Sequence, residues 1–406
     1  MANTSSQNSV LSHRVLSIKE SPTLAITAKA AKYKVDGRPI IGLAAGEPDF
    51  DTPQHIKDAA KKAIDDGFTK YTPVSGIPSL KKAIVNKFKN ENNFDYSVNE
   101  VIVGVGGKQT IFNLCLAVLN QGDEVIIPAP YWVSYADIAM IAEATPIIIE
   151  CGIEQKFKLQ PAQLEAAITA KTKLVMFNSP SNPTGAVYNL DELKALGDVL
   201  LKHPHVLVAT DDMYEHVNLS GDQFYNILNA TPNLKNRCIV LNGVSKAYSM
   251  TGWRIGYAAG PAHIIKAMEI LQSQSTSNPT SISQVAAQAA LEGDQECIQP
   301  MVKAFCERHE YVVNRFNQMP GLSCLKAGGA FYAFPDARVA IVNLHKAGKI
   351  KQATDMALAE YLLETHHVAI VPGSAFGAEG YFRISFATSM ENLTVALDRI
   401  EKALIV

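Results

Sequence analysis

The chain has 406 residues, of which 47% are apolar, so it is long enough for a large buried core and for two or three domains. Its formal net charge is only -2 at pH 7, a balance that argues against nucleic acid or an anionic lipid surface as a partner. No unbroken apolar run could span a bilayer, the N-terminus lacks the features of a secretory signal, and the six cysteines form no Cys-x-x-Cys pair. We therefore expect a cytoplasmic protein with no membrane partner.

The middle of the chain alternates short apolar runs with amphipathic ones, which is the rhythm of βαβ units. Between about residues 71 and 260 the runs are VIVGV, QTIFNLCLAVL, EVIIP, KLVMFN, ELKALGDVLL, VLVAT and CIVLNGV. Strands made almost entirely of Val, Ile and Leu indicate a sheet buried on both faces. The pattern predicts an α/β fold whose large domain has a mostly parallel sheet covered by helices on both faces. Ligands of such sheets bind beyond the carboxyl ends of the strands.

The C-terminal part changes character after about residue 260, where long helical stretches lead into a second unit. From residue 322 onward, short strands alternate with helices in the way that is typical of a small α+β domain. We expect three segments: an N-terminal arm with the first part of the small domain (1–55), the large domain (56–296) and the C-terminal small domain (297–406).

The first candidate site follows the predicted strand VIVGV. Gly106, Gly107 and Lys108 begin an amphipathic helix there, and the backbone N–H groups of a helix start can cradle a phosphate. The glycines do not fit the dinucleotide pattern G-x-G-x-x-G, so this signal is weak by itself. Trp132, after the strand EVIIP, suits a ring stacked on a flat cofactor, although a plain core position is equally consistent with the sequence.

Polar side chains also follow the next two predicted strands. KLVMF leads into the turn at residues 178–185, whose Asn182 amide could reach a ligand, although such turns commonly serve only to reverse the chain. VLVAT leads into Asp211 and, three residues on, Tyr214. Asp211 could cap a turn, or an ionised Asp211 could keep a heterocyclic nitrogen protonated so that a pyridine ring acts as an electron sink.

Two further cations stand in apolar surroundings. Lys246 follows the strand CIVLNGV and has Arg254 close behind it, and a desolvated lysine of lowered pKa can form a Schiff base with a carbonyl. Arg383 lies inside the predicted strand YFRISFA, where a guanidinium needs an anion such as a substrate carboxylate. The histidines show no metal spacing, and we expect His366 and His367 to form a solvated pair at a helix end. The sequence predicts no metal site.

Taken together, these residues resemble the class I aminotransferases of the fold type I pyridoxal-phosphate family, from about residue 11 to the C-terminus. The shared segments are GEPDF at 46–50, KY at 70–71, NPTG at 182–185, Asp211 with Tyr214, the stretch from Ser245-Lys246 to Arg254-Ile255-Gly256, and Arg383. The segments GGKQ, PYWVSY and MTGWRIGY are most similar to bacterial aspartate aminotransferases, some of which also accept prephenate.

The resemblance implies pyridoxal 5'-phosphate as cofactor, bound to Lys246, which would also shuttle the substrate Cα proton. Asp211 would hold the ring nitrogen, Asn182 and Tyr214 would contact the phenolic oxygen, and Trp132 would cover one ring face.

The resemblance also implies how the phosphate is held. Gly106, Gly107, Lys108 and Arg254 would surround it, and Tyr71 would reach the phosphate of a neighbouring subunit, so a homodimer with shared active sites is expected.

The substrate residues implied are Arg383 and the Gly46 backbone for the α-carboxylate, beside Trp132 and Asn182. Lys108 would attract a distal carboxylate, with Ser21 closing over it. The chain departs from many relatives at Gly243, where they carry a serine that meets the phosphate, so phosphate binding here should depend more on Arg254.

The reaction implied is ping-pong transfer of the amino group from L-aspartate to 2-oxoglutarate. Prephenate or aromatic amino-acid transamination is the nearest alternative. A pyridoxal-phosphate lyase of the same fold is a second, and an effector-binding domain of a transcription regulator is a third. The last is disfavoured because no helix-turn-helix or basic linker precedes residue 20.

Overall fold

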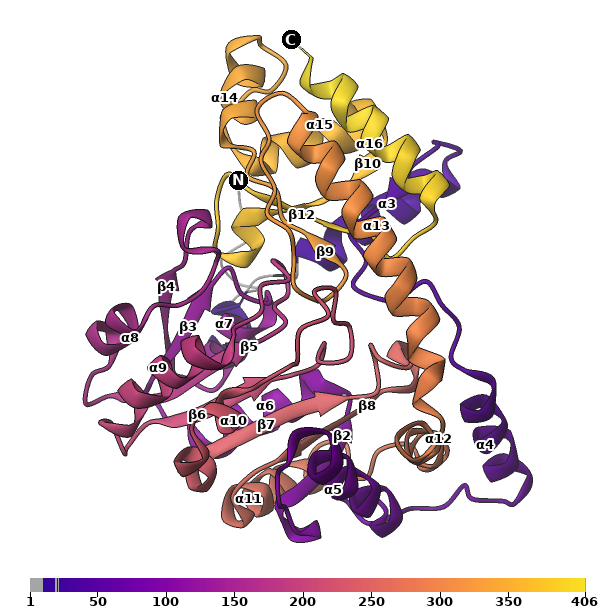
Figure 1. Cartoon of the computed structure of the whole chain (residues 1–406), viewed down its shortest axis with the longest axis vertical. Coiled ribbons are helices and arrows are strands. Elements are labelled where there is room, and N and C mark those ends of the chain that lie inside the picture. The colour runs from indigo at the N-terminus through magenta and orange to yellow at the C-terminus, as the bar shows by residue number, and fades with distance from the viewer. Residues whose placement is uncertain (1–9, 19, 21, 406) are drawn as a thin grey trace.

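The computed structural model describes residues 10–18, 20 and 22–405. A seven-stranded sheet crosses its lower half in the view of Figure 1, with the strand order β2-β8-β7-β6-β5-β3-β4. The strands are β2 (Val101–Val105), β3 (Glu124–Ala129), β4 (Thr145–Glu150), β5 (Thr172–Asn178), β6 (Leu207–Asp211), β7 (Cys238–Gly243) and β8 (Ile255–Ala259). All neighbours are parallel except β8, which is antiparallel to both β2 and β7. The predicted mostly parallel sheet is confirmed.

Helices cover both faces of this sheet, because successive side chains of each strand point to opposite sides. In β5, Leu174 and Met176 join one buried cluster, whereas Val175 and Phe177 join another. The first face is covered by α6 (Gly107–Val118), α7 (Ser134–Ile141) and α11 (Ala262–Ser273). The second is covered by α5 (Pro78–Asn92), α9 (Leu190–Leu201) and α12 (Ser281–Glu292). Burial on both faces explains why the strands read as continuous apolar runs.

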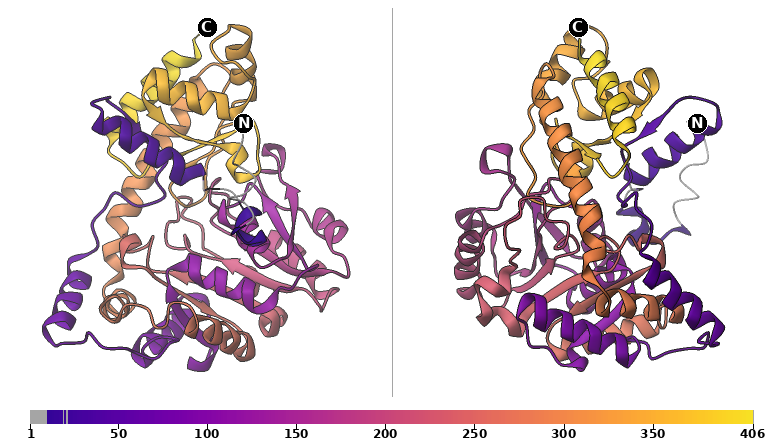
Figure 2. Two further views of the ribbon diagram at one scale, coloured as in Figure 1. Left: turned by 180° about the vertical axis from the view of Figure 1, so that it is seen from behind. Right: turned by 45° about the vertical axis from the view of Figure 1, so that its right-hand side comes forward.

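The C-terminal elements form the upper part of the molecule, which the long helix α13 (Gln299–Gln318) joins to the region of the large sheet (Figures 1 and 2). They contain a small antiparallel sheet in the order β11-β12-β9 and a parallel pair, β1 with β10. The strands are β1 (Ile41–Gly42), β9 (Tyr332–Ala333), β10 (Val368–Ala369), β11 (Val371–Pro372) and β12 (Phe382–Ser385). The helices are α14 (Arg338–Lys346), α15 (Asp355–His366) and α16 (Met390–Leu404).

The remaining helices are short or lie near the N-terminal end of the described chain. They are α2 (His13–Leu16), α3 (Pro22–Val35), α4 (Gln54–Asp65), α8 (Pro161–Ala167) and α10 (Ile227–Ala230). Since β1 pairs with β10, the segment that follows α3 is attached to the C-terminal elements. The domain boundaries at 55 and 296 stay predictions. None of the helices in the described part of the chain is long and apolar enough to cross a membrane.

Three strands of the large sheet end at the same edge and so bring distant residues together. Asn178, the last residue of β5, stands opposite Asp211, the last residue of β6, and Asp211 stands opposite Leu241 near the end of β7. The register therefore gathers the polar side chains that the sequence places after these strands.

Candidate active site

A cavity of about 400 Å³ lies at this edge of the large sheet. Most of the predicted site residues line it, namely Gly46, Gly107, Lys108, Trp132, Asn182, Asp211, Tyr214, Lys246, Arg254 and Arg383. Gly106 directly precedes this set at the start of α6. Tyr71 is 93% exposed and is not among the residues that line the cavity. Ser21 lies outside the described residues.

Lys246 follows the end of β7 and projects into the cavity. Its Nζ atom donates a hydrogen bond of 2.5 Å to the Gly46 carbonyl oxygen and lies 5.9 Å from the ring centres of Tyr214 and Phe331. Burial lowers the pKa of Lys246 from 10.5 to about 8, although the charge of Glu47 acts in the opposite direction. The amine therefore loses its proton far more readily than an ordinary lysine does, and the neutral form is the one that attacks a carbonyl.

Asp211 is a buried carboxylate held by two donors. The Tyr135 hydroxyl donates to Oδ2 at 2.5 Å, and the Met213 backbone N–H donates to Oδ1 at 3.2 Å. Burial raises the pKa of Asp211, and both hydrogen bonds oppose that rise. Tyr135 was not among the residues that the sequence pointed to, although it lies only three residues after Trp132, and the two rings meet edge to face at 5.3 Å.

The turn that carries Asn182 is tied to the end of β6 by Asn178. The Asn178 side chain donates to the Asp211 carbonyl oxygen at 2.8 Å and accepts from the Asn182 backbone N–H at 2.7 Å. Tyr214 shares a hydrogen bond of 2.8 Å with the hydroxyl of Tyr332, a second residue that the sequence did not point to. Asn178 and Tyr332 both line the cavity, so the site has more polar members than the strand ends alone suggest.

The start of α6 forms a cradle with positive charge beside it. Gly106 has a φ of 81°, and a Cβ atom there would collide with the guanidinium of Arg254, so only glycine fits. The N–H groups of Gly107 and Lys108, the first two residues of α6, have no carbonyl partner one turn earlier in the helix, whereas the Gln109 N–H already donates to the Gly106 carbonyl oxygen at 3.1 Å. Arg254 is held at this place by a hydrogen bond of 2.8 Å from Nη1 to the Thr251 carbonyl oxygen. Exposed N–H groups beside a guanidinium are suited to binding a phosphate.

A side chain at Gly243 would be crowded by its neighbours. A Cβ atom there would lie 3.0 Å from the Ile255 carbonyl oxygen, 3.0 Å from the Met213 Cε atom and 3.1 Å from the Gly256 Cα atom. Close packing of β7 against β8 accounts for the glycine. The positive charge near the cradle comes from Arg254.

Arg383 is the most constrained cation of the site. It is 2% exposed, and its Nη1 and Nη2 atoms donate to Asn182 Oδ1 at 2.8 Å and to the Ala44 carbonyl oxygen at 2.7 Å. Its guanidinium lies 4.4 Å from the ring centre of Tyr332 and 5.0 Å from that of Phe376. Burial lowers its pKa, and its Nε atom is buried without a hydrogen-bond partner among the described residues. A bound carboxylate would satisfy that donor and offset the burial of the charge.

Lys108 supplies a further cation to the same cavity, beside Lys246, Arg254 and Arg383. Its Nζ atom lies 5.0 Å from the ring centre of Trp132. Burial lowers the pKa of Lys108, and the charge of Arg254 lowers it further. Thr23 and Thr27 of α3 also line the cavity, so the N-terminal helix forms part of its wall.

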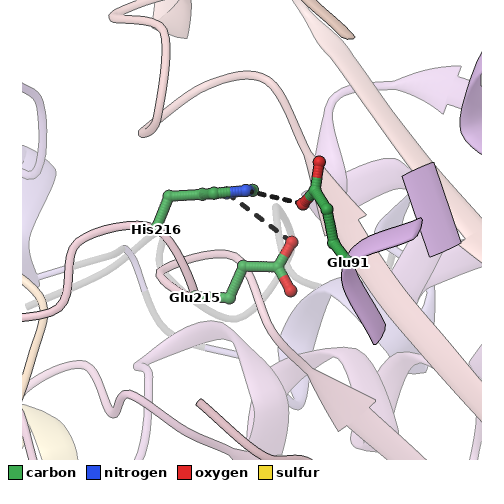
Figure 3. A group of neighbouring side chains, drawn as sticks. All are labelled: Glu91, Glu215 and His216. Carbon is green, nitrogen blue, oxygen red and sulfur yellow. Dashed lines mark hydrogen bonds and ion pairs between the residues drawn. The ribbon is translucent and has the colours of Figure 1, made fainter. Parts of the chain in front are cut away.

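A separate group of charged side chains adjoins the turn after Asp211 without lining the cavity. Glu91, Glu215 and His216 lie close enough to share a cation (Figure 3), with His216 Nε2 2.8 Å from Glu91 and Nδ1 3.6 Å from Glu215. The fully buried ammonium of Lys87, however, already pairs with Glu215 and lies 3.5 Å from Glu91. The carboxylates are therefore neutralised by a lysine, and we interpret the group as a buried ion-pair network.

Comparison with known proteins identifies the family. The family model of aminotransferase class I and II matches residues 38–400. The chain is 62% identical to an aspartate/prephenate aminotransferase of Nitrosomonas europaea over 97% of its own length and 99% of that protein. Among solved structures it is similar to an aspartate aminotransferase from Rhizobium meliloti (49% identity, 97% and 98% of the chains, TM-score 0.91) and to one from Thermus thermophilus with maleate (40% identity, 97% and 99%, TM-score 0.90). The chain belongs to the class I and II aminotransferases.

Proposed function

We propose that this aminotransferase uses pyridoxal 5'-phosphate to move the amino group of L-aspartate to 2-oxoglutarate, giving oxaloacetate and L-glutamate in a ping-pong reaction. One observation carries the proposal: a single cavity holds Lys246, an amine of lowered pKa, and Arg383, a buried guanidinium with an unpaired Nε. The first can move a proton and the second can anchor an α-carboxylate. The printed names of the relatives support aspartate as the amino donor.

The side chains around Lys246 fit the cofactor. Asp211 is a buried carboxylate that gains from a cationic N–H partner, Asn182 and Tyr214 would contact the phenolic oxygen, and Trp132 would cover one ring face. When bound, the cofactor supplies an electron sink for the charge left on the substrate Cα atom.

The cradle at the start of α6 fits the phosphate. Gly106, Gly107, Lys108 and Arg254 would surround it, with N–H groups and two cations against a dianion.

Proton transfer and substrate orientation would be carried out by residues of the chain itself. Lys246 Nζ would take the proton from the substrate Cα atom and return it on the other side of the transfer. Arg383 and the Gly46 backbone would orient the α-carboxylate so that the Cα–H bond faces Lys246, whose hydrogen bond to Gly46 already places the two together. Lys108 would attract the distal carboxylate, and Ser21 would close over it to exclude water.

The active enzyme is, in this proposal, a cytoplasmic homodimer with two shared sites. Tyr71 stands almost fully exposed and away from the cavity of its own chain, as expected of a residue that completes the phosphate site of the second subunit. The small domain, including residues 1–55 and 297–406, would move against the large domain 56–296 when substrate binds.

A second acceptor is also proposed, because relatives with 52 to 62% identity bear the name aspartate/prephenate aminotransferase. Prephenate carries two carboxylates, so Arg383 and Lys108 could bind it by the same charges. Aspartate remains the preferred donor in the proposal.

The test is to assay the purified protein with L-aspartate and 2-oxoglutarate, and separately with L-glutamate and prephenate. We expect both pairs to react, and we expect the Lys246→Ala variant to retain the cofactor without turnover. Release of ammonia without an oxo-acid acceptor would indicate a lyase. Inactivity with both pairs would overturn the substrates proposed, and normal turnover by Lys246→Ala would overturn the role of Lys246.

A further inference from the structure

The connection between α4 and α5 (Figure 1), residues 66–77, forms neither helix nor strand. Side chains of α11 and α12 are nevertheless bonded to it. Tyr71 lies in the middle of it and is 93% exposed. At the near end, Ser281 Oγ on α12 donates a hydrogen bond of 2.7 Å to the Phe68 carbonyl oxygen. Ordering a coil costs conformational entropy for each residue, so a fixed coil that presents an exposed tyrosine needs specific contacts to hold it.

Gln284 of α12 is fully buried and makes three hydrogen bonds, two to this segment and one to Pro279 just before its own helix. Its Nε2 atom donates to Thr72 Oγ1 at 2.9 Å and to the Pro279 carbonyl oxygen at 2.8 Å. Its Oε1 atom accepts from the Ile77 backbone N–H at 2.8 Å. One amide thus joins the residue directly after Tyr71 to the start of α5.

Gln272 of α11 is also fully buried and is hydrogen-bonded to the same segment. Its Nε2 atom donates to the carbonyl oxygens of Val74 at 2.7 Å and of Val103 in β2 at 2.8 Å. Its Oε1 atom accepts from Asn113 Nδ2 at 3.1 Å, and Asn113 belongs to α6, the helix of the phosphate cradle. The segment is therefore tied to β2 of the large sheet and to α6.

Packing alone does not explain two buried glutamines. An apolar side chain would fill the same space without the cost of burying an amide, which is offset only when its donors and acceptor are all paired. Both N–H donors of each amide are used, and each of the two amides binds backbone or side-chain atoms of residues 72–77. What the two residues add is a defined position for the chain next to Tyr71.

We propose that Gln272 and Gln284 are positioning residues that hold residues 72–77 so that Tyr71 reaches the cofactor phosphate of a second copy of this chain. The proposal rests on the homodimer with shared sites proposed above. Their effect on cofactor binding is therefore exerted in trans: a substitution at Gln284 weakens the site of the partner and spares the site of the chain that carries it.

The Gln284→Met variant removes the three hydrogen bonds and keeps the length of the side chain. Because Tyr71 of the altered chain is no longer held in place, we expect the dissociation constant for pyridoxal phosphate to rise about tenfold, which corresponds to about 1.4 kcal/mol of binding free energy. Gln288→Met on the same helix is the matched control, because Gln288 is bonded only to Glu292 at the surface and should leave the constant unchanged. The readout is the absorbance of the lysine-bound cofactor, which needs no substrate.

Hybrid dimers can be isolated by placing a different affinity tag on each of the two chains. They distinguish an effect of Gln284 on the site of the partner from an effect on the fold of its own chain. In the first hybrid, a Gln284→Met chain is paired with a Lys246→Ala chain, so the only competent site receives Tyr71 from a chain with intact Gln284. In the second, a wild-type chain is paired with a Lys246→Ala, Gln284→Met chain, so the only competent site receives Tyr71 from the altered chain. We expect wild-type affinity in the first hybrid and about tenfold weaker binding in the second.

Equal affinities in the two hybrids, or weaker binding in the first alone, would overturn the proposal. If Gln284→Met prevents folding, Thr72→Val takes its place in the same hybrids. This substitution removes the hydrogen bond from Gln284 at a half-buried position, and the same two outcomes support or overturn the proposal.

Sedimentation of the wild-type protein and its turnover of aspartate are measured first. A monomer would remove the dimer and this inference together, whereas a dimer inactive on aspartate would overturn the substrate alone and leave the affinity test valid.

Discussion

The Lys246 ammonium has exchanged bulk water for a single carbonyl acceptor, that of Gly46, and two aromatic rings. Burial therefore favours its neutral form and lowers its pKa to about 8. The same shift that makes the amine reactive also makes the cofactor-free protein less stable, because folding must bury a charge wherever the lysine is protonated.

The stability cost of Lys246 should depend on pH in one direction. Between about pH 8 and the usual pKa of 10.5, unfolding takes up a proton, so raising the pH favours the folded state. Below pH 8 both states are protonated and the cost is constant. We expect Lys246→Met to be more stable than the cofactor-free wild type by up to about 3 kcal/mol at pH 7, with a difference that shrinks as the pH rises through this window.

Urea unfolding of the two cofactor-free proteins from pH 7 to pH 10 measures this difference. Lys346→Met, at the exposed end of α14, is the control and should leave the wild-type pH dependence unchanged. A constant gap between Lys246→Met and wild type across the range would show that Lys246 keeps an ordinary pKa.

Among the elements, strand ends were the most informative part of the sequence. Each of the three parallel strands β5, β6 and β7 is an apolar run followed by a polar residue, and such runs end at one edge of the sheet, so Asn182, Asp211 and Lys246 could be expected to meet. Tyr135 and Tyr332 could not be expected, because their contacts with Asp211 and Tyr214 depend on where α7 and β9 pack.

At the C-terminal end of α15 the sequence predicted the end of the helix but not the environment of its histidines. α15 does end at His366, as the sequence predicts, but His366 and His367 are half-buried, so they are not fully solvated. His366 Nε2 lies 3.1 Å from the Tyr361 hydroxyl and the two rings meet at 5.0 Å, so burial lowers the pKa of His366 despite its place at a helix C-terminus. The positive charges of Lys402 and Lys349 lower the pKa of His366 further, and a sequence does not show which side of a helix end faces the protein.

The ion pair that joins α5 to the turn after β6 leads to a prediction about stability. The Lys87 and Glu215 side chains are 0% and 4% exposed, and the lysine offsets the cost of burying the carboxylate, so the pKa of Glu215 falls to about 2. Lys87→Met should destabilise the protein by about 3–5 kcal/mol because it leaves a buried charge unpaired. Adding Glu215→Met should recover part of this loss.

Urea unfolding of the two single variants and the double variant measures the coupling. Lys61→Met removes a surface ion pair in which Lys61 is 66% and Asp58 57% exposed, and it should leave the stability almost unchanged. Additive losses for Lys87→Met and Glu215→Met would contradict a coupled pair.

For the whole molecule, the class of fold followed from the alternation of runs, but the topology did not. The antiparallel β8 and the pairing of β1 with β10 join segments far apart in the chain, and no local pattern fixes which strands become neighbours. The consequence for the site is large, because β8 brings Arg254 beside Gly106.

The cavity joins parts of the chain that fold around different cores, and a ligand with two carboxylates should therefore stabilise the whole molecule. Arg383 comes from β12 and is bonded to Asn182 and Ala44, whereas Lys108 comes from α6. Maleate, which has no amino or oxo group to react, can engage both cations, and at about 100 times its dissociation constant a ligand adds about 2.7 kcal/mol.

We expect maleate to raise the melting temperature of the cofactor-loaded enzyme, and crotonate, which lacks one carboxylate, to raise it much less at the same concentration. Differential scanning calorimetry measures both shifts. In Lys108→Met the advantage of maleate over crotonate should disappear, since only the Arg383 contact remains, and in Arg383→Met both shifts should fall. Equal shifts for the two acids in the wild-type enzyme would mean that Lys108 does not bind the distal carboxylate, and the preference for dicarboxylic substrates would then need another cation.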